Sequence, residues 1–114
     1  MSGSGRILHT INPRLHPEQV AWIINHAEDE ALCFDLTFLP IIKAIHAACR
    51  RVRQWVVLCD RDALPADTGI PGLISYEDWI AGEATSYDWP DLDEDSAACL
   101  CYTSGTTGNP KGVL

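Results

Sequence analysis

The sequence predicts an α/β protein with a partial parallel sheet and crossover helices, followed by a strand, a glycine-rich loop and a second strand. Three short apolar runs alternate with stretches of helical periodicity, which is typical of parallel strands joined by crossover helices. The chain has 114 residues, of which 46% are hydrophobic and 21% are charged, so it is sized for one domain with a buried core. This composition excludes a disordered tail, and no apolar run is long enough to span a bilayer.

The first half of the chain alternates between predicted strands and helices. The expected strands are Arg6–Ile11, Ala31–Asp35 and Gln54–Cys59. The first helix should begin near Pro17, since proline suits a first helical turn, and end between His26 and Asp29. We expect Thr37 to cap a second helix with Pro40 in its first turn and an apolar stripe of Ile41, Ile42, Ile45, Ala48 and Cys49.

The second half is less regular and ends in the glycine-rich loop. Asp62–Pro71 is predicted as loop, and Ser75 with Asp78 should cap a short helix over Tyr76–Ala81. Tyr87–Ser96 is an acidic connector, which we interpret as solvated instead of cation-binding. Strands are expected at Ala97–Thr103 and from Val113. We therefore describe one domain in three segments, residues 1–61, 62–96 and 97–114.

The distribution of charge argues against a nucleic-acid partner. The net charge is -8, and Lys111 is the only basic residue after Arg61. A protein that binds nucleic acid without sequence preference needs clustered cations along one face. The single cluster here, Arg50, Arg51 and Arg53, suits the carboxyl end of a helix, where cations are favourable.

The cysteines indicate a reducing compartment and no metal site. The chain has five cysteines, no CxxC pair and no secretory signal, so we expect free thiols and a cytoplasmic location. Cys99 and Cys101 would share one face of a strand. A metal site is one interpretation of this pair, but buried small hydrophobic side chains are the favoured one. The histidines are scattered, and we assign no metal ligand.

The stretch Thr103–Gly112 (TSGTTGNPKG) carries the chemistry of this chain. Gly105 and Gly108 allow positive φ and a close approach of the backbone to a ligand. Such a loop can direct several N–H groups at an anion. Lys111 supplies positive charge, and further donors are the hydroxyls of Ser104, Thr106 and Thr107. The group suits a polyphosphate.

Two other interpretations of this loop were weighed. A flexible Gly/Ser/Thr linker rarely places a lone lysine after proline with a strand on each side. A Walker A loop counted from Gly105 would need glycine at position 110 and Ser or Thr at position 112. Those positions hold Pro110 and Gly112, and a strand follows instead of a helix. The P-loop NTPase interpretation therefore fails.

Two stretches resemble a known family. Tyr102 to Val113 (YTSGTTGNPKGV) resembles the phosphate-loop signature of the AMP-forming adenylate synthetases, which include acyl-CoA synthetases, luciferases and peptide-synthetase adenylation domains. His9 to Gln19 (HTINPRLHPEQ) is similar to the equivalent stretch in bacterial medium- and long-chain fatty acyl-CoA synthetases. The order of strands and helices also resembles their large N-terminal domain.

The resemblance implies an acid–thiol ligase that works in two steps. A carboxylate, here a fatty acid, attacks the α-phosphorus of ATP to give an acyl-adenylate and pyrophosphate, and CoA then displaces AMP. The loop holds the β- and γ-phosphates in this family. Carried over, the phosphate-binding residues are Thr103, Ser104, Gly105, Thr106, Thr107, Gly108 and Lys111. A fatty substrate would also allow peripheral contact with a membrane.

The resemblance further implies that this chain is a fragment. The magnesium-coordinating glutamate, acyl pocket, CoA tunnel and C-terminal domain with the catalytic lysine would all lie beyond Leu114. We therefore expect no catalytic residue in this chain and no activity from it alone. Two alternatives stay open, a non-catalytic nucleotide- or phosphate-binding module and a defunct remnant without a ligand.

Overall fold

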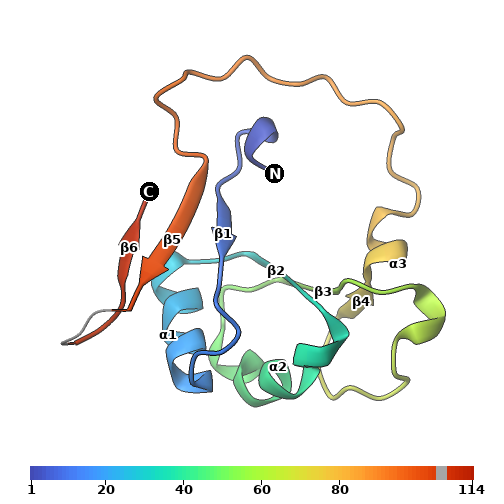
Figure 1. Cartoon of the computed structure of the whole chain (residues 1–114). Helices are drawn as coiled ribbons and strands as arrows, with labels where there is room; N and C mark the ends of the chain where they lie inside the picture. The colour runs from blue at the N-terminus through green and yellow to red at the C-terminus, as the bar shows by residue number, and fades with distance from the viewer. Residues whose placement is uncertain (105–107) are drawn as a thin grey trace. The chain divides into compact units, whose positions relative to one another are not determined.

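The structure, a computed structural model, describes residues 1–104 and 108–114 as a mixed α/β chain (Figure 1). The chain forms two compact units. The central unit is Pro13–Glu83, and the terminal unit joins Met1–Asn12 to Ala84–Leu114. Each unit has its own three-stranded sheet. These units do not coincide with the three segments drawn from the sequence, because the first strand pairs with residues near the carboxyl end of the chain.

The sheet of the central unit is parallel, as the sequence predicts. Its strands are β2 (Ala31–Phe34), β3 (Gln54–Val57) and β4 (Leu73–Ser75), and β3 lies between the other two. The sequence analysis missed β4. It is short and lies between the left-handed Gly72 and a helix, so alternation of apolar and polar residues cannot reveal it.

Helix α1 (Pro17–Ala27) begins and ends where its local signals predict. Pro17 occupies the first turn, and the His16 side chain accepts a hydrogen bond from the Glu18 N–H at 3.4 Å. The helix ends as Glu28 adopts a left-handed φ of 59°. Glu28 also forms an ion pair with Arg51 at 3.1 Å, and both side chains are exposed.

The start of the second helix differs from the prediction. Thr37 does not cap it: the residue before α2 is Phe38, which makes no capping hydrogen bond through its side chain, and Asp35 caps the 3-10 turn that precedes α2. The Asp35 Oδ1 atom accepts hydrogen bonds from the Thr37 N–H at 2.9 Å and the Thr37 hydroxyl at 2.7 Å, which lowers the pKa of the Asp35 carboxyl. These bonds stabilise a 3-10 turn at Leu36–Phe38, and α2 (Leu39–Ile45) follows with Pro40 in its first turn, as expected.

The core of the central unit forms where the apolar faces of α1 and α2 meet the sheet. Ile23 and Ile24 of α1 and Val56 and Val57 of β3 are at most 1% exposed. The rest of this core is also apolar and comes from both helices, the strands and the connections: Val20, Phe34, Leu39, Ile42, Ile45, Cys49, Val52, Trp55 and Ile70. A three-residue 3-10 turn, His46–Ala48, continues the stripe of α2 to the buried Cys49.

The sheet of the terminal unit is mixed. It consists of β1 (Leu8–Thr10), β5 (Cys99–Thr103) and β6 (Lys111–Val113), with β5 in the centre (Figure 1). β1 is parallel to β5, and β6 is antiparallel to it. The expectation that the first strand joins the parallel sheet of the later strands is wrong. Its partner is β5. The prediction failed because pairing between segments far apart in the chain leaves no local signal in the sequence.

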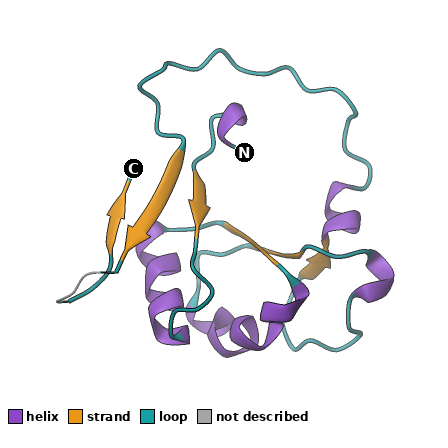
Figure 2. Ribbon diagram, viewed as in Figure 1, coloured by secondary structure: helices purple, strands orange, loops and turns teal. Residues whose placement is uncertain are grey.

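Residues 81–98, all of which the structure describes, contain no helix or strand (Figure 2). This matches the predicted acidic connector. Tyr87 and Trp89 pack edge to face there with ring centroids 5.0 Å apart, and Trp89 lies against Gly3 near the amino terminus. Among the residues that the structure describes, no helix is long and apolar enough to cross a membrane.

The amino end of α3 (Tyr76–Ile80) carries the predicted cap. The buried Ser75 hydroxyl accepts from the Asp78 N–H at 3.1 Å and donates to Asp78 Oδ2 at 3.0 Å. Asp78 Oδ1 accepts from Arg61 Nε at 2.5 Å, and this hydrogen bond lowers the pKa of the Asp78 carboxyl. The cap therefore also ties α3 to the 3-10 turn at Arg61–Ala63.

Replacing Ser75 with alanine should loosen this end of the central unit. The Asp78 N–H would lose its acceptor at a cost of about 1 kcal/mol, equivalent to about fivefold faster opening of the helix. Amide hydrogen exchange of the α3 peptide in the full-length gene product measures this rate. Ser86→Ala, in the irregular segment, is the matched control. Equal exchange in both variants would contradict the assigned cap.

Candidate functional site

The candidate site is the hairpin of β5 and β6, whose strands flank the predicted phosphate loop. Thr103 is the last residue of β5 and pairs with Lys111, the first residue of β6. The hairpin thus places a hydroxyl and an ammonium group at neighbouring positions beside the loop. Three of the predicted site residues, Gly105, Thr106 and Thr107, lie outside the described residues.

Gly108 has a backbone conformation that only glycine adopts readily. Its φ is +100°, and an added Cβ atom would meet no atom of the described residues within 4 Å. The requirement for glycine at this position therefore comes from the backbone and not from crowding. The expectation that Gly108 permits positive φ is confirmed.

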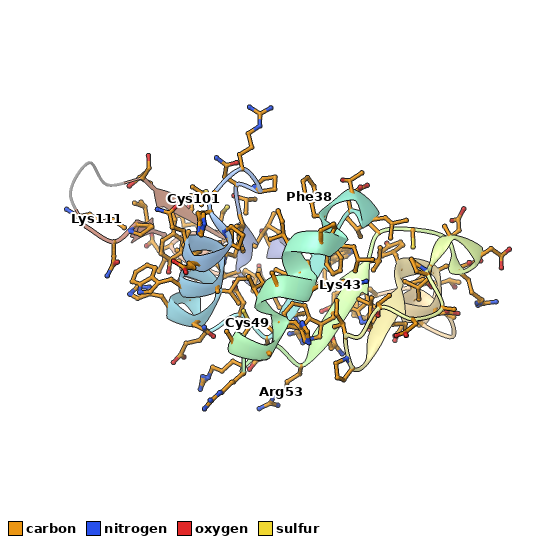
Figure 3. All side chains as sticks on the ribbon, turned by 90° about the horizontal axis from the view of Figure 1, so that it is seen from below. Phe38, Lys43, Cys49, Arg53, Cys101 and Lys111 are labelled. Atoms are coloured by element: carbon orange, nitrogen blue, oxygen red, sulfur yellow. The ribbon has the colours of Figure 1, made fainter. Side chains whose placement is uncertain are left out.

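The charge around the hairpin favours an anionic ligand. Lys111 is the only charged side chain between Cys99 and Leu114, although the second half of the chain is otherwise acidic. Thr103, Ser104, Gly108 and Lys111 are all exposed, and Figure 3 labels Lys111 on this hairpin. An exposed ammonium group beside hydroxyl and backbone N–H donors can bind phosphate oxygens through charge-assisted hydrogen bonds.

The two faces of the hairpin differ in chemistry. Side chains alternate along a strand, so Thr103 and Lys111 share a face with Cys101, and Tyr102 and Gly112 occupy the other face. The Sγ atoms of Cys99 and Cys101 are 3.8 Å apart, and Cys101 Sγ lies 3.4 Å from the hydroxyl of Thr10 on β1.

The expected burial of Cys99 and Cys101 is wrong, because both side chains are exposed in the structure. The prediction rested on the frequent burial of cysteine, but the face of β5 that carries these thiols is open. Residues 1–104 and 108–114 contain no group of three or more His, Cys, Asp or Glu side chains placed to hold a metal ion.

The sequence analysis assigned no individual role to Tyr102 or Gly112. The structure pairs them across β5 and β6, with the tyrosine ring over the glycine. An aromatic residue and a glycine on facing strands are a recognisable pair. Finding this pair requires the register of the hairpin, which the sequence alone does not supply.

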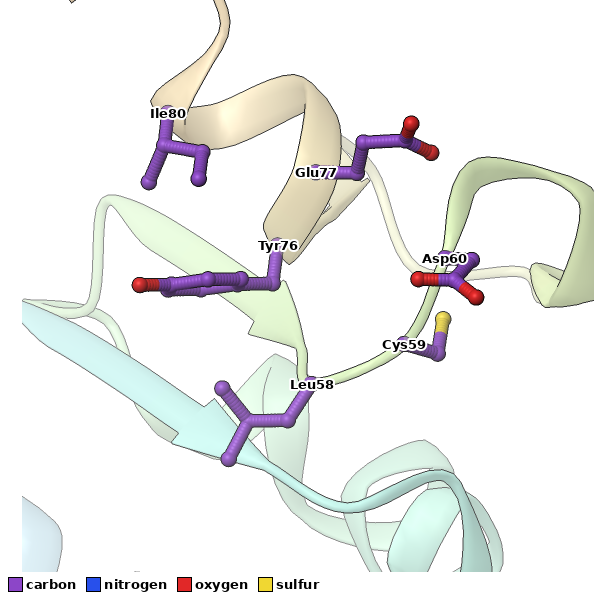
Figure 4. Close-up of a pocket in the computed structure, with 6 residues that line it drawn as sticks. All are labelled: Leu58, Cys59, Asp60, Tyr76, Glu77 and Ile80. Atoms are coloured by element: carbon purple, nitrogen blue, oxygen red, sulfur yellow. The ribbon is translucent and has the colours of Figure 1, made fainter.

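The central unit contains a separate open cavity of about 510 Å³ (Figure 4). Six residues line it, from the end of β3 and from α3: Leu58, Cys59, Asp60, Tyr76, Glu77 and Ile80. Figure 4 shows Leu58, Tyr76 and Ile80 on one side of the cavity and the Asp60 and Glu77 carboxylates, with Cys59, on the other. Two carboxylates repel phosphate, so the hairpin is the better candidate for an anionic ligand.

The chain is similar to known proteins along almost its whole length. The family model for AMP-binding enzymes matches residues 2–114. The chain is 53% identical over its full length to a medium-chain-fatty-acid–CoA ligase of Ectopseudomonas oleovorans, and it covers 21% of that protein. It is 54% identical over its full length to a 3-methylmercaptopropionyl-CoA ligase of Ruegeria pomeroyi, again covering 21%.

A solved structure shows the same fold. The crystal structure of the anthranilate CoA ligase AuaEII with anthranoyl-AMP superposes with a TM-score of 0.80 at 29% identity, covering 94% of this chain and 19% of that one. The chain therefore spans about a fifth of the length of the relatives it matches. Because the family model matches almost all of its residues, the chain belongs to the AMP-binding enzyme family.

Proposed function

We propose that this chain supplies the triphosphate-binding hairpin of an ATP-dependent acyl-CoA synthetase. One observation carries the proposal: Thr103 and Lys111 pair at the base of a glycine-rich loop in a chain of the AMP-binding enzyme family. Both relatives above 50% identity and the anthranilate ligase are named as CoA ligases, which supports the reaction class.

In the proposed first step, a substrate carboxylate oxygen attacks the α-phosphorus of ATP. The bond from the α-phosphorus to the bridging oxygen breaks, and pyrophosphate leaves with the electron pair. Negative charge therefore grows on the β- and γ-phosphates in the transition state. Donors placed on those phosphates lower the barrier, and the proposed donors are Thr103, Ser104, Gly105, Thr106, Thr107, Gly108 and Lys111.

In the proposed second step, the CoA thiol attacks the acyl carbon and AMP leaves, which yields the thioester. The acyl group of the proposed substrate is aliphatic, with fatty acids as the first choice. Support comes from the relatives above 50% identity, which are named for a medium-chain fatty acid and for 3-methylmercaptopropionate. Both names describe aliphatic carboxylates.

The proposal places no metal ligand on this chain. Mg²⁺ prefers carboxylate oxygens and water, and the hairpin from Cys99 to Leu114 has no Asp or Glu. Mg²⁺ would enter as its complex with ATP and supply charge neutralisation on the phosphates. The proposal also includes a cytoplasmic location, which is supported by five cysteines that are all free thiols.

A second candidate function is a nucleotide- or phosphate-binding module without catalysis, and a third is a remnant without a ligand. The exposed hairpin, with its lysine and hydroxyl groups, fits a binding module as well as an enzyme. An enzyme catalyses pyrophosphate exchange into ATP when the right carboxylate is present. A module binds MgATP but does not exchange pyrophosphate, and a remnant does neither.

Replacing Lys111 with alanine should slow adenylation. A donor aimed at charge that forms in the transition state is worth about 2.7–4 kcal/mol, so we expect carboxylate-dependent pyrophosphate exchange by the full-length gene product to be about 100- to 1000-fold slower. Lys43→Ala, which removes an exposed lysine from α2, is the matched control and should keep wild-type kinetics. Unchanged exchange in the Lys111 variant would remove the proposed role of this residue.

The chain of residues 1–114 alone should form no thioester and should bind MgATP weakly or not at all. It covers about a fifth of each relative, and exposed apolar side chains such as Trp89, Ile80 and Leu58 favour association. Calorimetry with MgATP, together with light scattering, measures both properties. Tight binding by a monomer with a cooperative thermal transition would instead support the binding module.

A further inference from the structure

The face of the hairpin opposite Lys111 contains an unusually close contact between β5 and β6. Tyr102 of β5 pairs with Gly112 of β6. A Cβ atom added at Gly112 would lie 3.1 Å from Cζ, 3.3 Å from Cε1 and 3.3 Å from the hydroxyl oxygen of Tyr102. Carbon atoms in ordinary contact are about 3.5–4.0 Å apart, so the ring or the strand would have to move slightly to admit a side chain at position 112.

The reason for glycine at position 112 differs from the reason at position 108. Gly108 has a left-handed φ of +100° and open space around it, so its backbone requires glycine. Gly112 is not among the residues with positive φ and lies in a strand, so its backbone would accept alanine. Among the described residues, the nearest atoms to a side chain at this position belong to the Tyr102 ring.

The tyrosine ring also contacts the first strand of the terminal unit. The ring centroids of Tyr102 and His9 on β1 are 5.2 Å apart with a tilt of 43°, which is within the range of favourable aromatic contacts. Tyr102 therefore reaches a neighbour on each side, His9 of β1 and Gly112 of β6. A glycine weakens a strand, and an aromatic ring that covers the glycine restores packing across it.

This contact fixes the register of the hairpin. A shift of β6 by one residue would bring Lys111 or Val113 opposite Tyr102, where a side chain would contact the ring unless the ring moved aside. The same shift would turn Lys111 to the other face of the hairpin, because side chains alternate along a strand. The ring over Gly112 thus selects the one register in which Lys111 pairs with Thr103.

We propose that Tyr102 and Gly112 are positioning residues, which act through the register of β5 and β6 to place Lys111 and Thr103 on the triphosphate of ATP. The inference rests on the proposed function. It goes beyond that function by assigning a role in ATP binding to two residues that need not touch the nucleotide.

The test is a double-mutant cycle in the full-length gene product, read by pyrophosphate exchange. Gly112→Ala should lower kcat/KM for ATP by about tenfold, because the new methyl group displaces the ring or the strand, and the KM for the carboxylate should not change. Tyr102→Leu removes Cε1, Cζ and the hydroxyl. Adding it to Gly112→Ala should therefore restore kcat/KM for ATP to the value of Tyr102→Leu alone.

Two matched controls separate the ring contact from general damage. Tyr102→Phe retains Cζ and Cε1, so it should not rescue Gly112→Ala. Tyr102→Leu should not rescue Gly108→Ala, since the constraint at Gly108 is its φ. Wild-type kinetics in Gly112→Ala would overturn the proposal. So would a double variant with Tyr102→Leu in which the fold losses of kcat/KM for ATP from the two single substitutions multiply.

Hydrogen exchange of the Cys99–Leu114 peptide in the same proteins separates this inference from the proposed function. If the wild-type protein does not exchange pyrophosphate into ATP, the proposed function fails. The amide hydrogen exchange rates would still show whether Tyr102→Leu reverses the loss of protection in the hairpin caused by Gly112→Ala. If Gly112→Ala does not fold, a folded double variant supports the contact. If neither variant folds, the contact does not determine the register and the inference fails.

Discussion

The candidate site depends on one constraint, the antiparallel register of β5 and β6. This register pairs Thr103 with Lys111 and Tyr102 with Gly112. It puts the hydroxyl and the ammonium group on one face beside the loop and the aromatic contact on the other. A shift by one residue would exchange the two faces, so the binding chemistry and the packing chemistry are linked through the backbone.

The two glycines of the described hairpin illustrate different physical requirements. Gly108 is required by its left-handed backbone, which allows the chain to turn out of the loop. Gly112 is favoured by space, because an added Cβ atom would lie only 3.1 Å from the Tyr102 ring. In the sequence, both positions are simply glycine, so the two requirements cannot be told apart. Only the structure shows that one shapes the loop and the other sets the alignment of its strands.

Features with local signals could be predicted from the sequence. Pro17 marks the start of α1, Ser75 with Asp78 marks the start of α3, and the run around Lys111 marks the hairpin. Features set by distant partners could not be predicted. The pairing of β1 with β5, the short β4 and the open face of Cys101 depend on segments far apart in the chain.

The central claim is that the hairpin binds the triphosphate of ATP. The most direct measurement is a crystal structure of the full-length gene product with a non-hydrolysable ATP analogue. The account predicts phosphate oxygens within hydrogen-bond distance of Lys111 Nζ and of the Thr103 or Ser104 hydroxyl, with Tyr102 packed on Gly112 behind them. An analogue bound elsewhere, with no phosphate oxygen near the hairpin, would contradict it.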